Sequence, residues 1–111
     1  MSSAPNLTYP TALVLHALAS GYAYGFDIID ATGLPSGTVY PLLRRLERMR
    51  CVESRWENES KAAREGRPAR RYYRITGEGR ELLARAKTRF AGLGRALRPG
   101  ATPTGKESPA W

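Results

Sequence analysis

The side chains best suited to chemistry in this sequence are cations, and they gather in its middle. Residues 1–43 contain no Lys or Arg, whereas residues 44–74 contain eleven basic side chains against five acidic ones. The whole chain of 111 residues carries a formal charge of +8. Guanidinium and ammonium groups bind phosphate oxygens, so this excess indicates a polyanionic partner, either nucleic acid or an anionic membrane face.

One group of these cations lies in a segment with helical spacing, residues 36–50. Its apolar residues recur three and four apart and form one stripe for burial: Val39, Leu42, Leu43, Leu46 and Met49. Arg48 and the other polar side chains lie off the stripe. On a lone helix such a face is usually only solvated, but the basic segment that follows favours contact with DNA.

The polar side chains of this helix suit different parts of a DNA duplex. Ser36 and Thr38 lie at the end that would enter a major groove, where hydroxyls can bond phosphates or base edges. Tyr40 suits a phosphate or a thymine methyl group. Arg44 and Arg45 are long enough to reach phosphates and, less often, guanine.

A second group of cations follows in a predicted β-hairpin. Residues 51–57 and 70–75 alternate as half-buried strands do, and residues 58–69 between them are polar and rich in turn-forming types. Between residues 58 and 74 the hairpin carries six cations that can follow the phosphates of a flanking minor groove: Lys61, Arg64, Arg67, Arg70, Arg71 and Arg74. Phosphate contacts should add affinity more than specificity.

Several residues of the hairpin have a structural alternative. Arg71 and Arg74 lie within a strand, where at least one of them can instead pair with Glu53 or Glu57. The aromatic residues are expected to pack in the core and hairpin rather than to stack on bases: Tyr22, Tyr24, Tyr72, Tyr73 and Trp56.

The remaining residue types argue against an enzyme, a cofactor and a metal site. The only cysteine, Cys51, excludes an intrachain disulfide and a zinc finger, and a packing role is favoured over a reactive thiol. There is no His/Cys cluster, no pair of carboxylates in a common pocket and no nucleophile beside a base. No apolar run approaches the roughly 20 residues of a membrane span, and residues 1–12 lack a secretion signal. We therefore expect a soluble, cytoplasmic protein.

The elements that must position the cations begin with a very apolar segment, residues 11–20. A helix that is apolar on every side is expected to be buried on every side, against its own domain and a second chain. His16 on this helix is expected to be buried or at an interface, with contact to a ligand as the alternative. A short helix over residues 24–31 follows, and Gly33 then allows a tight turn.

Two further helices complete the prediction. Ser36 is a suitable N-cap for the contact helix, but Pro41 should distort its first turn because proline lacks the N–H. Thr76 can cap a last helix over residues 77–97. Its apolar residues step by three and four, a heptad seam that suits a partner helix: Leu83, Ala86, Phe90, Leu93 and Leu97. Glycines near its end each cost roughly 1 kcal/mol, so we expect that end to fray.

The order of elements predicts a winged helix-turn-helix, mainly α in an α+β fold, with a two-stranded wing and a C-terminal dimerisation helix. A chain of this length suits one domain. Residues 1–10 would form a flexible arm and residues 11–75 the DNA-binding domain. Residues 76–97 would form the dimerisation helix and residues 98–111 a disordered tail.

The sequence resembles the PadR family of bacterial regulators over about residues 9–90. The match is carried by YGFDII at 24–29, by SGTVYP running into LLRRLE at 36–47, and by GRPARRYYRIT running into GEGRELL at 66–83. The resemblance also accounts for Pro41. It implies a homodimer that represses a neighbouring operon, released in many members by a small aromatic or drug-like molecule. It implies DNA contacts at six positions: Ser36, Thr38, Tyr40, Pro41, Arg67 and Arg70.

These observations together predict a sequence-specific regulator of double-stranded DNA, acting as a homodimer. The residues expected at the dimer interface are Leu13, Leu83, Ala86, Phe90, Leu93 and Leu97. A pocket for a small aromatic ligand is expected at His16, Phe90 and Leu93. The alternatives are a DNA-binding regulator without an inducer, and a protein-interaction adaptor on the same fold.

Overall fold

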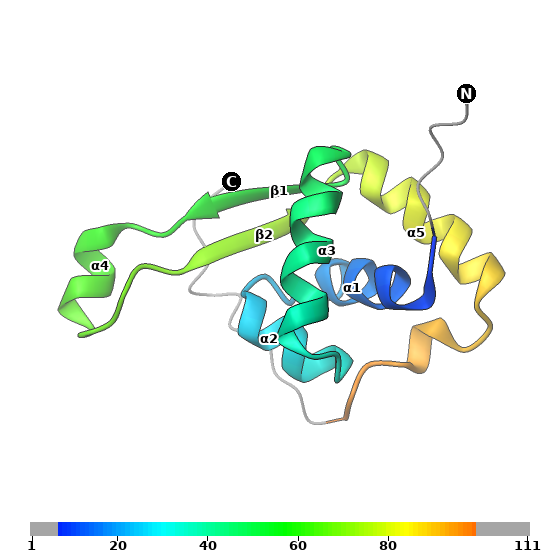
Figure 1. The fold of residues 1–111 in the computed structure, drawn as a ribbon, viewed down its shortest axis with the longest axis horizontal. Helices are drawn as coiled ribbons and strands as arrows, with labels where there is room; N and C mark the ends of the chain where they lie inside the picture. The colour runs from blue at the N-terminus through cyan, green and yellow to red at the C-terminus, as the bar shows by residue number, and fades with distance from the viewer. Residues whose placement is uncertain (1–6, 100–111) are drawn as a thin grey trace.

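The helices and the sheet follow the predicted order in the computed structural model, which describes residues 7–99 (Figure 1). The elements are α1 (Tyr9–Ala19), α2 (Gly25–Thr32), α3 (Ser36–Arg48), β1 (Val52–Trp56), α4 (Glu59–Arg64), β2 (Arg71–Ile75), α5 (Gly77–Arg89) and the short 3₁₀ helix η1 (Leu93–Arg95). Most of the arm and tail predicted at the two ends lies outside the described residues. Among those residues, no helix is both long and apolar enough to cross a membrane.

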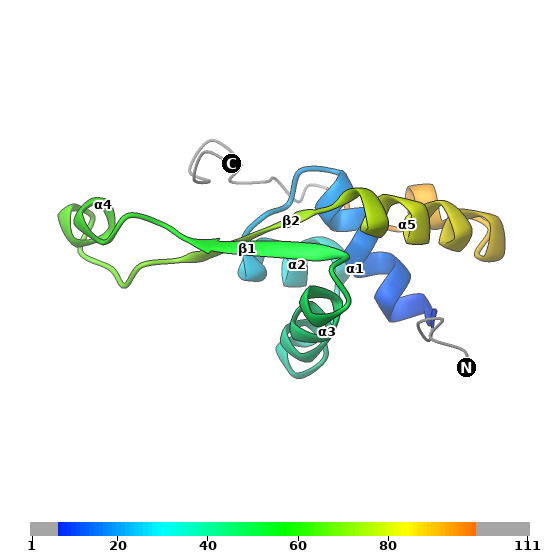
Figure 2. The ribbon, with the colours of Figure 1, turned by 90° about the horizontal axis from the view of Figure 1, so that it is seen from above.

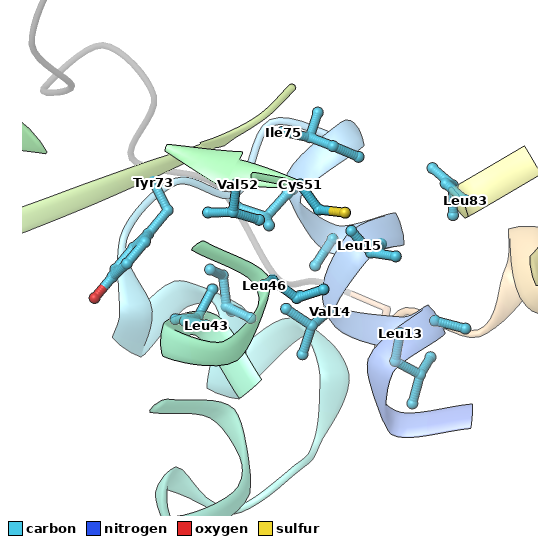
Figure 3. Packing of buried hydrophobic residues seen from close by; sticks show 14 of the residues in the cluster. Leu13, Val14, Leu15, Leu43, Leu46, Cys51, Val52, Tyr73, Ile75 and Leu83 are labelled. Carbon is cyan, nitrogen blue, oxygen red and sulfur yellow. The ribbon is translucent and has the colours of Figure 1, made fainter. Parts of the chain in front are cut away.

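The first helix is the centre of the hydrophobic core. It starts two residues earlier than predicted because Thr8 caps it and Pro10 fits its first turn, where no N–H is needed. Most of its residues are buried, and it packs against α2, α3, α5 and β2. Figure 3 shows its side chains meeting those of α3, β1 and α5: Leu13, Val14, Leu15, Leu43, Leu46, Val52 and Leu83.

The tight turn between α2 and α3 forms as predicted. Gly33 ends α2 with a φ of 75°, a left-handed conformation that favours glycine. The hydroxyl of Thr32 donates to the carbonyl of Ile28 at 2.7 Å, and the N–H of Leu34 donates back to that hydroxyl at 3.2 Å. These bonds fix the angle at which α3 leaves the body.

Two details predicted for α3 are wrong. Its N-cap is Pro35, whose carbonyl accepts from Thr38 and Val39, and Ser36 is the first helical residue. The helix also runs unbroken across Pro41. The carbonyl deprived of a partner there is that of Gly37, four residues earlier. Because both residues are exposed, water can replace the missing bond.

The two strands pair antiparallel, with Val52 opposite Ile75 and Trp56 opposite Arg71. The far edge of β2 is also occupied, because the N–H of Tyr73 donates to the carbonyl of Ala23 at 2.8 Å. The sheet is thereby attached to the segment that precedes α2. Together α2, the turn and α3 form a helix-turn-helix, and β1, α4 and β2 form the wing, which confirms the winged helix-turn-helix.

The tip of the wing is a short helix where we expected only turns. The side chain of Asn58 caps α4 by accepting from the N–H groups of Ser60 and Lys61 at 2.7 and 3.3 Å. Figure 1 shows α4 at the far end of the hairpin, away from the helical body. Its order therefore depends on contacts within the wing itself.

The single C-terminal helix predicted to Leu97 is also wrong. The helix α5 ends at Arg89, and Gly92 adopts a φ of 84° before η1. This left-handed residue turns the chain back, so that Leu93 is buried against the protomer's own core. Beyond η1, the N–H of Arg98 donates to the carbonyl of Ala31 at 2.7 Å. Within the protomer, α1 contacts both α5 and η1, so part of the heptad spacing serves an internal contact.

Candidate nucleic-acid interface

The exposed side of α3 presents polar and cationic groups to solvent. Val39, Leu43 and Leu46 are buried, and the opposite side exposes six positions: Ser36, Gly37, Pro41, Arg44, Arg45 and Arg48. Thr38 is half-buried. Figure 2 shows α3 projecting to one side of the sheet, while α5 lies on the other side of the body. A helix projecting in this way has the access that entry into a major groove requires.

The N-terminus of α3 is suited to phosphate. The first N–H groups of a helix have no carbonyl partner within the helix, and the helix dipole favours negative charge there. In α3 these groups belong to Ser36 and Gly37, which are both exposed. No acidic side chain lies in this first turn. The N-terminus can therefore receive a phosphate without repulsion from its own residues.

Tyr40 has a structural contact that the sequence did not indicate. Its ring is half-buried against Gly25 at the start of α2, where a Cβ would lie only 2.6 Å from the ring carbon Cε1 and from the hydroxyl oxygen. Burial raises the pKa of the phenol above its ordinary value, and the neighbouring Tyr24 and Tyr73 act in the same direction. Tyr40 therefore positions α3 on α2, and this ring orientation does not support a direct DNA contact.

The wing tip is held together by a buried carboxylate that sequence reasoning missed. The side chain of Glu57 is 2% exposed and forms a two-pronged pair with the guanidinium of Arg67, with one bond at 3.1 Å. It also accepts from the N–H of Arg70 at 2.9 Å. The bond from Arg67 is the main reason why the pKa of Glu57 falls to about 2 from its ordinary value near 4.5.

Arg67 is consequently paired within the wing, and the DNA contact predicted for it stays a prediction. Its guanidinium is also bonded to Glu65 at 2.8 Å, and its side chain is only 17% exposed. The two carboxylates raise the pKa of Arg67 above its ordinary value. Its role in this structure is to close the hairpin behind α4. Among the other cations of the tip, Arg64 is exposed and Lys61 is half-buried.

The strand arginines are paired, which settles the alternatives left by the sequence. Arg74 bonds Glu53 at 2.8 Å, so one of the predicted cross-strand pairs is confirmed. Arg71 instead reaches Glu47 of α3 at 3.4 Å, a pair that the sequence did not indicate. The guanidinium of Arg70 lies over the ring of Tyr24, 4.7 Å from its centroid.

The aromatic residues are used mainly as we expected, with one exception. Tyr22, Tyr72 and Tyr73 are buried, which confirms their packing role, and Tyr24 packs against Tyr72 at a centroid distance of 5.8 Å. Trp56 is 63% exposed, so the prediction that it packs in the hairpin is wrong.

Three arginines meet around a surface hollow between α3 and β2. The hollow has a volume of about 390 Å³ and is lined by Arg44, Glu47, Arg48 and Arg71. Sequence reasoning treated the helix and strand cations as separate groups, because only the folded chain places them side by side.

The residues predicted for the dimer interface and ligand pocket lie near one another, but most of them are buried within a single protomer. Leu13, Leu83, Ala86 and Leu93 are at most 5% exposed within one protomer. Phe90 and Leu97 are half-buried. The exposed ring of Tyr9 stands edge-on to Phe90 at a centroid distance of 5.4 Å.

His16 faces the same region. Its Nδ1 is buried and has no hydrogen-bond partner among the described residues. Burial lowers the pKa of the imidazole below its ordinary value, as does the charge of Lys87, whereas a backbone interaction with Gly94 opposes the shift. His16 is therefore neutral at pH 7, with an unsatisfied nitrogen beside η1.

Comparison with known proteins gives a consistent result. The model of the family described as transcriptional regulator PadR-like matches residues 14–85. No curated protein matches the sequence.

Solved structures similar to the chain include three regulators. A PadR family transcription regulator from Clostridium difficile is 26% identical with a TM-score of 0.65, and the match covers 79% of this chain and 93% of that one. A PadR family transcriptional regulator from Eggerthella lenta is 28% identical with a TM-score of 0.57, over 73% of each chain. A PadR-like transcription factor from Bacteroides fragilis is 26% identical with a TM-score of 0.56, over 78% of this chain and 86% of that one.

Proposed function

This chain belongs to the PadR-like family of transcriptional regulators, and we propose that it is a homodimeric repressor that binds operator DNA specifically through α3. It is a regulator and not an enzyme. The observation that carries the proposal is the solvent-facing side of α3, where an open N-terminus precedes three exposed arginines on one projecting helix. DNA as the partner places its action in the cytoplasm.

The two parts of the interface have different tasks in this proposal. Ser36 and Thr38 at the N-terminus of α3 meet base edges and adjacent phosphates in the major groove. Arg45 on α3 and the wing cations Lys61 and Arg64 bind phosphates, which attract every sequence alike. Two protomers would place their α3 helices in successive major grooves, about 34–36 Å apart.

The test is binding to DNA from the chain's own promoter, compared with random DNA of equal length at the same salt concentration. Specific regulation predicts tighter binding to the promoter fragment. Thr38→Ala should reduce this preference, because it removes a groove contact and leaves the phosphate contacts in place. Arg64→Ala should weaken both DNAs equally. Arg80→Ala on α5 is the matched control for charge, since α5 lies away from α3 (Figure 2). Equal affinity of the wild type for both DNAs would refute the proposal.

We extend the proposal to a small aromatic effector that binds near His16 and releases the DNA. The support is the buried, unpartnered Nδ1 of His16, which a ligand hydroxyl or N–H could satisfy. Titration with small aromatic compounds should then lower DNA affinity in the wild type and have less effect in His16→Phe. If the wild type keeps its DNA affinity throughout the titration, the protein is a regulator without such an inducer.

A further inference from the structure

Trp56 stands out because it is a large aromatic side chain that the fold leaves exposed. Side chains alternate along β1, so Trp56 shares a face with Val52 and Ser54. The hydroxyl of Ser54 donates to Glu47 of α3 at 2.7 Å, which identifies this face as the one that α3 packs against. Trp56 therefore lies on the α3 side of the wing, two residues beyond the point where helix and strand touch.

The indole is held in place by a cation. Arg71 lies opposite Trp56 in the strand ladder, and its guanidinium lies 5.6 Å from the centroid of the Trp56 ring. The same guanidinium donates to Ser54 at 2.8 and 3.0 Å and pairs with Glu47 at 3.4 Å. This network joins the wing to α3 and places a guanidinium beside the exposed ring.

The positive charge beside the Trp56 ring favours an anionic partner. The hollow beside Arg71 is lined by three arginines and one glutamate, so it retains a positive charge after pairing. Arg71 keeps 41% of its side-chain surface exposed despite its two oxygen partners. A cationic hollow of this kind favours a phosphate group, and it adjoins the exposed arginines of α3.

We propose that this hollow and Trp56 form a seat for the DNA backbone between the groove read by α3 and the groove followed by the wing. One phosphate enters the hollow between Arg48 and Arg71, and the neighbouring deoxyribose lies against the indole of Trp56. The indole N–H is available as a donor to a phosphate oxygen. The inference rests on the proposed DNA-binding function and adds a contact that fixes the angle between wing and recognition helix.

The first experiment follows Trp56 directly. The sequence has two tryptophans, so a Trp111→Phe background leaves Trp56 as the only indole. Adding promoter DNA should shift its fluorescence and protect it from acrylamide quenching. A Trp56 signal that stays unchanged while the same protein binds the DNA would overturn the inference and leave the proposed function intact. If the wild type binds no DNA, the proposed function itself fails.

The second experiment separates the two parts of the seat by their salt dependence. Arg48→Ala should lower the slope of log affinity against log salt by about 1 per protomer. Trp56→Ala should weaken binding by about fivefold or more without changing that slope, because it removes an uncharged contact. Both losses should be equal on promoter and random DNA. Loss confined to the promoter would mean that Trp56 reads bases, which contradicts a backbone seat.

Thermal melting of each variant checks that the fold is retained. Trp56→Phe should recover part of the lost affinity, because a smaller ring keeps some contact with the sugar.

Discussion

The ring of Tyr40 occupies the space where a side chain on Gly25 would stand. A Cβ built on Gly25 would lie 2.6 Å from both Cε1 and the hydroxyl oxygen of Tyr40, well inside van der Waals contact. The start of α2 and the recognition helix α3 are therefore in direct contact through a ring and a bare Cα.

This contact predicts a clear effect of Gly25→Ala. The added methyl group forces Tyr40 to move, and overpacking of this kind costs about 1–3 kcal/mol of unfolding free energy. Because Tyr40 belongs to α3, DNA affinity should also fall. Thermal unfolding and DNA titration measure the two effects. Gly77→Ala is the control, since no atom lies within 4 Å of its Cβ position, and it should change neither quantity much.

The Glu57–Arg67 pair predicts that acid loosens the wing. The pKa of Glu57 is about 2 in the folded protein, below its ordinary value near 4.5. Its contribution to stability is therefore complete above pH 4.5 and is lost as the pH falls towards 2. Proteolysis and hydrogen exchange of residues 58–69 should increase over this range in the wild type.

Glu57→Gln should loosen the same segment already at pH 7, at a cost of about 1–3 kcal/mol, because Arg67 loses a charged partner. The difference between variant and wild type should then shrink as the pH falls from 5 to 2. Glu53→Gln is the control, because its pair with Arg74 is about half-exposed and worth at most about 1 kcal/mol. A wing equally protected at pH 7 and pH 2 would contradict this role of Glu57.

Cys51 should be unreactive in the folded protein. The thiol is 5% exposed, and burial raises its pKa, as does the nearby charge of Glu78. Thiolate is the reactive form, so at pH 8 a disulfide reagent should label the native protein at least about tenfold more slowly than the unfolded chain. The labelling rate should rise with denaturant in step with unfolding. Rapid labelling without denaturant would show that this part of the core opens readily.

The course of the chain after α5 predicts different effects for a buried residue of the predicted interface and for an exposed residue beside it. Leu83 is 5% exposed within the protomer, so Leu83→Ala should cost about 2–5 kcal/mol of unfolding free energy. Tyr9 is 43% exposed and contacts Phe90, so Tyr9→Ser should weaken dimer formation with little loss of stability. Sedimentation and thermal melting separate the two effects. If Leu83→Ala dissociated the dimer without lowering the stability of the protomer, the predicted heptad contact between protomers would be correct.

Sequence reasoning succeeded where local chemistry decides the structure. The apolar stripe of α3, the turn at Gly33 and the cap at Thr76, whose hydroxyl accepts from Gly79 at 3.1 Å, all depend on neighbours close in the chain. Such features follow from spacing and residue type.

Features that depend on residues far apart in the chain could not be predicted from the sequence. Glu57 alternates with apolar neighbours as a surface residue would, and only its contact with Arg67, ten positions later, explains its burial. The contact of the Tyr40 ring with Gly25, fifteen positions earlier, has no signal in the sequence around either residue. The heptad spacing after Leu83 predicts a continuous helix to Leu97, whereas Gly92 adopts a left-handed conformation that the spacing does not reveal.

The central place of α1 has a consequence for the synthesis of the protein. Its apolar surface is covered partly by β2 and by α5, which starts only at Gly77. Chains are made from the N-terminus at about 5–20 residues per second, so α1 waits for seconds before its last partners exist. During that interval the apolar surface of α1 lacks its final partners, so we expect chaperones to bind the nascent chain at this segment.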